Sequence, residues 1–393
     1  MLMAAAQYKA TGFYVIEGAV GADEIREMQE EFEDILANQP AAKGSDVDAR
    51  GRPVRYPQRY NYSDAMSDPA GGGDSGVFNL ARPGDDLSVT EQRTGRHQMK
   101  MREPRPPPHA PRKVLANWGS PMQYADSDTL VRAYGHPSFL KIAEAINGED
   151  FVPFTETMWY KAPYATSTAW HQDPSASWDE EWAKPGFDVD KMGFSFHLSL
   201  YDGNAINSLW MLPGSQGQGR IDINALSASG DGSDRLPGAV PILLKPGDCF
   251  IQSRTALHGA FANMSDEPRC TFQFGFNKRA TVHNITTKGY GFSKWCAQRA
   301  FRSRGFDGPL GSGSPSGSIR GDGSTVTYDD EYLHQRSKMI QWAISARSQY
   351  YPDEEPYVYK PLADEAEELV WSPELRDDPE AFQVMSGGLT IVV

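Results

Sequence analysis

Cysteine is scarce in this chain, with only 3 among 393 residues. Cys249, Cys270 and Cys296 lack the close spacing of a zinc site, and their small, odd number argues against a disulfide framework. Sparse cysteine in a long chain is typical of a protein from a reducing compartment. The sequence therefore predicts a cytoplasmic protein.

Long apolar runs are also missing. No stretch approaches the length of a membrane span, and residues 1–6 (MLMAAA) lack the charged and apolar regions of a signal peptide. We therefore expect a soluble protein with no membrane partner.

Positive charge is the third deficit, because 38 Lys and Arg stand against 52 Asp and Glu, for a net charge of −14. An acidic surface repels the phosphates of nucleic acids and of anionic membranes. The composition thus argues against nucleic acid as a partner. With 39% hydrophobic residues, the chain can still bury a sizeable core.

The chain does contain residue types that bind metals. His171 and Asp173 lie two residues apart, so on an extended strand both side chains point to the same face and can bind one metal. A second histidine, His258, follows 87 residues later. Two histidines and one carboxylate on one side of a metal form the facial triad of non-haem iron oxygenases, which leaves coordination positions open for other ligands.

A single His-x-Asp motif can occur by chance, but the sequence around these residues supports a metal site. Residues 243–251 (LLKPGDCFI) read as strand, turn and strand, and the second strand runs towards His258. Arg269 comes eleven residues after His258 and begins a returning strand, where its guanidinium can pair with a carboxylate. His197 alternates with apolar residues in residues 193–200 and is a candidate for a co-substrate contact. The remaining histidines, His97 among them, are treated as non-ligands.

In order and spacing, the motifs of this chain resemble those of the phytanoyl-CoA dioxygenase family. The matching pieces are residues 8–16 (YKATGFYVI), 161–163 (KAP), 171–173 (HQD), 212–216 (LPGSQ) and 245–248 (KPGD), together with His258 and Arg269. Where the family usually has Pro-Gly-Ser-His, this chain has Gln216. The resemblance implies a mostly β fold with flanking helices and a double-stranded β-helix core of the jelly-roll, cupin-like type.

The resemblance also implies the cofactors and the roles of the site residues. His171, Asp173 and His258 would bind iron(II) at the catalytic centre, and Arg269 would form a salt bridge with the distal carboxylate of 2-oxoglutarate. With O₂ as the other co-substrate, such an enzyme hydroxylates an unactivated C–H bond of a small molecule, or desaturates or cyclises it, and releases succinate and CO₂.

Two other functions stay open at this point. A cupin-type isomerase or lyase would use the same metal ligands without 2-oxoglutarate, and release of succinate distinguishes it from a dioxygenase. A non-catalytic metal-binding protein of the same fold is the third reading, which intact ligands argue against.

The catalytic domain is predicted to span residues 1–280, with helices at residues 22–38 and 137–148 on its outside. It contains a long insertion, residues 39–113, that lacks periodicity and is rich in Gly, Pro and Arg. Within it, residues 50–113 hold 12 Lys and Arg against 7 acidic residues. The insertion is either a lid that meets an anionic substrate or a solvated loop, and we give these readings equal weight.

Residues 281–393 are predicted to be a C-terminal extension, with a helix at about residues 329–350. Packing on the catalytic domain is the simplest role for this helix, and the alternatives are capping the barrel, completing the active site or pairing subunits in a homo-oligomer. Trp178, Trp182 and Phe187 follow the metal motif, where they either line a substrate mouth or pack in the core.

Overall fold

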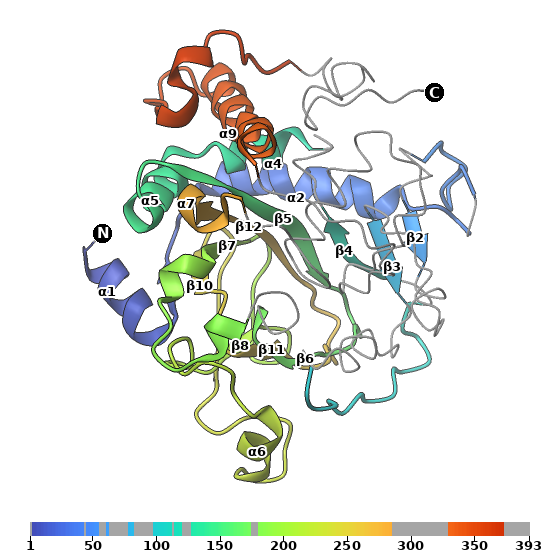
Figure 1. Ribbon diagram of the computed structural model, residues 1–393. Helices are drawn as coiled ribbons and strands as arrows, with labels where there is room; N and C mark the ends of the chain where they lie inside the picture. The colour runs from blue at the N-terminus through green and yellow to red at the C-terminus, as the bar shows by residue number, and fades with distance from the viewer. Residues whose placement is uncertain are drawn as a thin grey trace.

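Two β-sheets form the centre of the molecule. The computed structural model describes residues 2–42, 45–54, 60–62, 78–81, 97–111, 114–119, 127–173, 180–284 and 329–372. In these residues, one sheet has eight strands in the order β1-β10-β7-β12-β5-β4-β3-β2, and the other has four in the order β6-β11-β8-β9. The four-stranded sheet lies across the interior from the eight-stranded one, and the described strands do not close into a barrel (Figure 1).

The strands of the larger sheet are β1 (Phe13–Ile16), β10 (Cys249–Ser253), β7 (Phe194–Ser199), β12 (Arg269–Lys278), β5 (Phe151–Lys161), β4 (Val114–Gly119), β3 (Phe78–Ala81) and β2 (Tyr60–Tyr62). Those of the smaller sheet are β6 (Thr168–His171), β11 (His258–Ala260), β8 (Trp210–Met211) and β9 (Val240–Pro241). The α-helices are α1 (Leu2–Thr11), α2 (Ala22–Ala37), α4 (Asp128–Tyr134), α5 (Pro137–Asn147), α6 (Ile223–Ala228), α7 (Arg279–Val282) and α9 (Asp330–Tyr350). Short 3-10 helices are η4 (Glu180–Ala183), η5 (Val189–Met192) and η6 (Lys360–Glu365).

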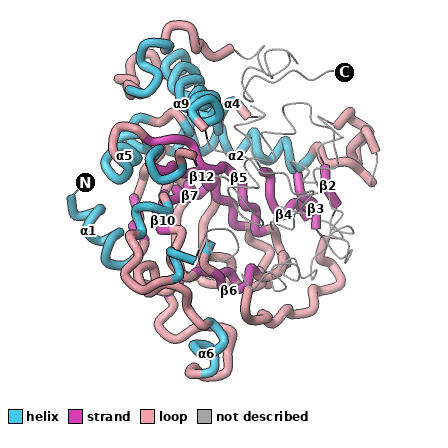
Figure 2. Tube along the Cα trace, viewed as in Figure 1, coloured by secondary structure: helices cyan, strands magenta, loops and turns pink. Residues whose placement is uncertain are grey.

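This arrangement confirms the predicted fold class, which is a mostly β jelly-roll core with flanking helices (Figure 2). Apart from the pairing of β2 with β3, which is parallel, the paired strands are antiparallel. Antiparallel strands need only short connections, so the chain can pass from one sheet to the other and back. Residues 254–257, for example, lead from β10 in the larger sheet to β11 in the smaller one.

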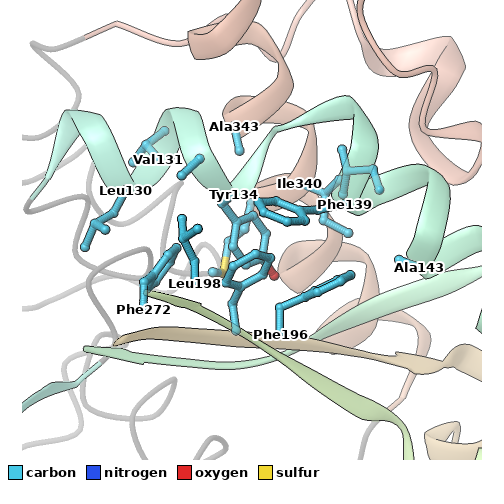
Figure 3. Packing of buried hydrophobic residues seen from close by; sticks show 14 of the residues in the cluster. Leu130, Val131, Tyr134, Phe139, Ala143, Phe196, Leu198, Phe272, Ile340 and Ala343 are labelled. Atoms are coloured by element: carbon cyan, nitrogen blue, oxygen red, sulfur yellow. The ribbon is translucent and has the colours of Figure 1, made fainter. Parts of the chain in front are cut away.

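The outer face of the larger sheet carries the main apolar core. In β12, aromatic residues alternate with polar ones, so that Phe272, Phe274 and Phe276 all point to this face, and all three are fully buried. Helices α4, α5 and α9 cover them (Figure 3). The residues that pack together here include Leu130, Val131, Tyr134, Phe139, Ala143, Phe196, Leu198, Phe272, Ile340 and Ala343.

Two of the covering helices follow from clear sequence signals. Helix α2 buries Ile25, Met28 and Phe32 at helical spacing, and α5 has Pro137 in its first turn. Helix α5 ends at Asn147, and the next residue, Gly148, has a φ of +83° that favours glycine. Helices α1 and α4 were not predicted. Helix α4 has only seven residues, too few for a reliable periodic signal, although its cap, Ser127, accepts a hydrogen bond from the Leu130 amide.

Helix α9 packs on this layer, over the range where the sequence predicts a helix. A Cβ at Gly135, after α4, would lie 2.2 Å from the carbonyl oxygen of Ala343, so only glycine allows this approach. The Arg347 guanidinium of α9 lies 2.8 Å from the Glu24 carboxylate, and this ion pair is almost fully buried. The predicted domain boundary near residue 280 stays a prediction. Among the described helices, none has the length and apolarity needed to cross a membrane.

The inner face of the larger sheet is polar and nevertheless buried. It faces the smaller sheet, and its buried polar residues are Thr157, Lys161, Ser195, His197, Ser199, Gln252, Thr271 and Asn277. Burying polar groups is costly unless they have partners. The interior between the sheets is therefore where a bound group is expected.

The described end of the predicted insertion, residues 97–111, lies along the smaller sheet. Gln98 exchanges hydrogen bonds with the backbone of Ile221 and Ile223, and Met101 packs in a cluster with Trp170. Most of the basic stretch, including residues 63–77 and 82–96, lies outside the described residues, as does the greater part of the proposed lid.

Candidate metal centre

Two histidines of the smaller sheet and an aspartate just after β6 meet at one point. His171 ends β6 and pairs in register with His258, the first residue of β11, while Asp173 follows two residues after His171. The Asp173 Oδ1 lies 3.5 Å from the His171 Nε2 and 3.7 Å from the His258 Nε2. The predicted triad is thus brought together by strand pairing across 87 residues of sequence.

Each histidine is held with one ring nitrogen turned away from this point. The His171 Nδ1 lies 2.8 Å from the carbonyl oxygen of Ala169, and the His258 Nδ1 lies 3.0 Å from that of Ala256. A carbonyl oxygen only accepts, so each Nδ1 carries the proton and each Nε2 presents a lone pair. Both rings are buried, which fixes their orientation.

The distances among these atoms fit one metal ion. Ligand atoms at about 2.1 Å from an ion lie roughly 3–4 Å from one another. Here, ligand atoms of all three residues lie within 4.8 Å of one another. Within the described part of the chain, this is the one group of three His, Cys, Asp or Glu residues arranged so closely. Two neutral imidazoles and one carboxylate suit a divalent transition metal such as iron(II).

A tight turn between β10 and β11 supports all three residues. The Arg254 carbonyl accepts a hydrogen bond of 3.1 Å from the Asp173 amide, and the Ala256 carbonyl accepts from His258. The Thr255 carbonyl accepts from Gln172, the residue between the two ligands of the HQD motif. The backbone of residues 254–256 therefore sets the relative positions of β6 and β11 at the site.

His197 reaches the site from the inner face of the larger sheet. Its ring stacks on Phe250 at 4.3 Å, and burial, then the nearby His258 and Arg269, lower its pKa to about 3. His197 is therefore neutral at neutral pH. Its Nε2 is buried and has no hydrogen-bond partner among the described residues. A bound group could supply that partner.

The side-chain amide of Gln252 links this face to the metal ligands. It lies 3.0 Å from the His258 Nδ1, close to His197. Because the His258 Nδ1 carries the proton, the amide oxygen of Gln252 is the atom that suits this contact. Sequence reasoning missed Gln252, which stands in an apolar strand pattern six residues before His258.

Arg269 begins β12 on the same inner face, where it pairs in register with Lys161 of β5. Arg269 is partly buried, but its Nε is enclosed and has no hydrogen-bond partner among the described residues. Burial lowers its pKa to about 10, which still leaves it charged at neutral pH. An enclosed guanidinium without a carboxylate partner is a ready site for an anion.

Lys161 lies beside Arg269 and is buried, with 6% of its surface exposed. Burial, followed by the charge of Arg269, lowers its pKa to about 7, and the charge of Glu103 opposes this shift. In the sequence, Lys161 stood out only as the first residue of a KAP motif. Its place beside Arg269 depends on strand pairing across 108 residues.

His97, from the end of the insertion, also approaches the centre. Its ring lies edge-on to that of His171, with 4.7 Å between the ring centroids. The three-residue group that could hold a metal consists of His171, Asp173 and His258, and the treatment of His97 as a non-ligand stays a prediction. No spacing in the sequence indicated this contact.

Trp182 is one of the aromatic residues that follow the metal motif in the sequence. Trp182 is buried, and the Arg220 guanidinium lies 5.4 Å from its ring. Trp178 lies outside the described residues.

Gln216, in place of the family's histidine, donates to the Lys9 carbonyl and so links its loop to α1.

Comparison with known proteins places these features in a family. The family model for phytanoyl-CoA dioxygenase matches residues 8–271. A comparison with curated proteins finds no match.

Several solved structures resemble this chain in part. The alpha ketoglutarate dependent epimerase SnoN from nogalamycin biosynthesis is 20% identical, with a TM-score of 0.40, over 70% of this chain and 80% of its own. EctD from S. alaskensis, solved with 2-oxoglutarate and 5-hydroxyectoine, is 16% identical, with a TM-score of 0.44, over 72% of this chain and 77% of its own. AviO1 from Streptomyces viridochromogenes Tue57 is 17% identical, with a TM-score of 0.44, over 70% of this chain and 94% of its own.

Proposed function

Because the chain belongs to the phytanoyl-CoA dioxygenase family, whose model matches residues 8–271, we propose that it is an iron(II)- and 2-oxoglutarate-dependent dioxygenase. Its proposed reaction is the hydroxylation, desaturation or cyclisation of a small molecule at an unactivated C–H bond. The observation that carries this proposal is the convergence of His171, Asp173 and His258, with both Nε2 atoms directed at the Asp173 carboxylate.

The donor set supports iron(II) as the metal. Two imidazoles and one carboxylate occupy one side of an ion and leave the opposite positions for a chelating co-substrate and O₂. Bound there, iron(II) with 2-oxoglutarate and O₂ supplies the oxidant for the C–H bond, with release of succinate and CO₂. The protein's own residues hold the ligands, orient the co-substrate and exclude water.

The inner face of the larger sheet supports 2-oxoglutarate as the co-substrate. Arg269 offers an enclosed Nε that has no partner among the described residues and that suits the distal carboxylate. His197 is neutral and presents a buried nitrogen in the same region, next to His258. We assign the anchoring role to Arg269 and a co-substrate contact to His197.

Binding of 2-oxoglutarate to the anaerobic iron(II) protein tests the proposal. Chelation of iron(II) by a 2-oxo acid gives a visible charge-transfer band, and admission of O₂ should then produce succinate. Arg269→Leu should weaken 2-oxoglutarate binding by about 2–3 kcal/mol, because a charge-assisted pair is lost, while iron binding stays intact. If the unmodified protein bound iron but gave neither the band nor succinate, the proposed function would be wrong.

A further inference from the structure

Lys161 is a buried cation that the proposed function does not yet use. Its side chain lies on the inner face of the larger sheet, and its ammonium donates to the carbonyl oxygen of Thr166. Among the described residues, no carboxylate forms an ion pair with it. A lysine is almost never buried to this extent without a charged partner.

A second cation beside Lys161 raises the electrostatic cost of keeping the lysine charged. Arg269 lies directly across the strand pair, so two positive groups are enclosed side by side. The negative charge of Glu103, from residues 97–111, partly opposes this effect, but that carboxylate already accepts hydrogen bonds from the amide and hydroxyl of Ser167. Two enclosed cations are stabilised best by one group that carries negative charge to both.

We propose that Lys161 is a second binding residue for the distal carboxylate of 2-oxoglutarate, and that binding of the co-substrate is coupled to protonation of Lys161. The inference rests on the proposed function and deepens it. Arg269 is positively charged with or without the co-substrate. Lys161 becomes fully protonated, and so charged, when the 2-oxoglutarate dianion binds. The proton comes from solvent and is held as the third hydrogen of the ammonium group.

The direction of the pH effect follows from the pKa of Lys161 before the co-substrate binds. Burial and the charge of Arg269 lower that pKa to about 7, so at pH 8 most of the lysine is neutral. A bound carboxylate stabilises the ammonium and raises the pKa again. Binding therefore takes up a proton above pH 7. The dissociation constant of 2-oxoglutarate should rise with pH by up to about tenfold per unit over this range.

The alternative is that Lys161 is structural and only anchors the loop that carries Thr166. In that case, removing its charge would affect the stability of the loop but would not change co-substrate affinity in a charge-dependent way. Lys161→Met and Lys161→Arg separate the two roles, because both keep a long side chain and only the second keeps a charge.

The first measurement is an anaerobic titration of the iron(II) protein with 2-oxoglutarate, followed by the charge-transfer band. For Lys161→Met, we expect the dissociation constant to rise about 10- to 100-fold, the range for loss of a hydrogen bond to a charged group. Lys161→Arg should stay within about threefold of the unmodified protein. Lys278→Met is the matched control, because Lys278 is an exposed lysine at the far end of β12. An unchanged constant for Lys161→Met, with iron still bound, would overturn the inference.

The second measurement is titration calorimetry at pH 8 in two buffers of different ionisation enthalpy, which counts protons taken up on binding. The unmodified protein should take up close to one proton, and Lys161→Arg should take up none while still binding. Equal uptake by both proteins would exclude Lys161 as the proton acceptor. If the unmodified protein gave no charge-transfer band, the proposed function itself would fail, whereas a normal band with no Lys161 effect would reject this inference alone.

Discussion

The two faces of the eight-stranded sheet bury opposite kinds of side chain. On the outer face, Phe272, Phe274 and Phe276 of β12 pack under helices. The inner face, which is turned towards the smaller sheet and the metal ligands, carries Arg269, Thr271 and Gln273 of the same strand. The single strand β12 thus contributes to both the apolar core and the polar interior, because successive side chains on a strand point to opposite faces.

This comparison indicates how stability and chemistry are divided in the molecule. The apolar face gains free energy from burial and close packing, whereas the polar face contains groups that have no partner among the described residues, such as the Arg269 Nε and the His197 Nε2. Substitutions on the outer face should therefore change folding, and those on the inner face should mainly change binding.

The largest effect is expected for Phe274→Ala on the outer face. Phe274 is fully buried among five aromatic rings, with centroid distances of 4.9 to 6.3 Å. Its truncation leaves a cavity and should lower the free energy of unfolding by about 3–5 kcal/mol, as measured by denaturant titration. The folded fraction should still bind iron(II) normally. Loss of iron binding by the folded Phe274→Ala protein would contradict the claim that the outer face determines stability and the inner face determines binding.

The next effect concerns the ion pairs that hold α9 on the outer layer. Arg347→Met removes a guanidinium that contacts both Glu24 and Glu354, and it leaves Glu24 buried without this partner. We expect a loss of about 3 kcal/mol, since breaking a buried pair from one side leaves an uncompensated charge. The control is the double variant Glu24→Gln with Arg347→Met, which should be destabilised by less than the sum of the two single variants. Strict additivity would show that this pair does not hold the helix.

The smallest effect is expected on the inner face at Ser195. Its hydroxyl is buried without a hydrogen-bond partner among the described residues, so Ser195→Ala removes a polar group that gains nothing from burial. The free energy of unfolding should change by less than about 1 kcal/mol and should not fall. A clear destabilisation in thermal unfolding would mean that the hydroxyl has a partner outside the described residues.

The sequence predicts the parts of this fold that depend on local patterns. The alternation from Arg269 to Phe274 indicates a strand, and the spacing of Ile25, Met28 and Phe32 indicates α2, as the structure has them. His171 and Asp173 could be placed on one face because they are two positions apart, with only Gln172 between them. Helix α4 escaped prediction because its seven residues draw their stability from tertiary packing.

The parts that could not be predicted depend on which strands pair. Lys161 meets Arg269, and Gln252 meets His258, only through sheet register and the turn between the sheets. His97 reaches His171 from an insertion without periodicity. The alternation of β12 also does not reveal that its polar face is the enclosed one, since the polar face of an antiparallel sheet is commonly solvated.

The central claim is that His171, Asp173 and His258 form one iron(II) site. Its most direct test is anaerobic equilibrium dialysis with iron(II) of the unmodified protein, His171→Ala, His258→Ala and the control His334→Ala, a partly exposed histidine on α9. The unmodified protein and the control should each bind one iron(II) per chain, and both site variants should lose this binding, because two remaining ligands hold a ferrous ion poorly. Normal stoichiometric iron binding by either site variant would contradict the assignment.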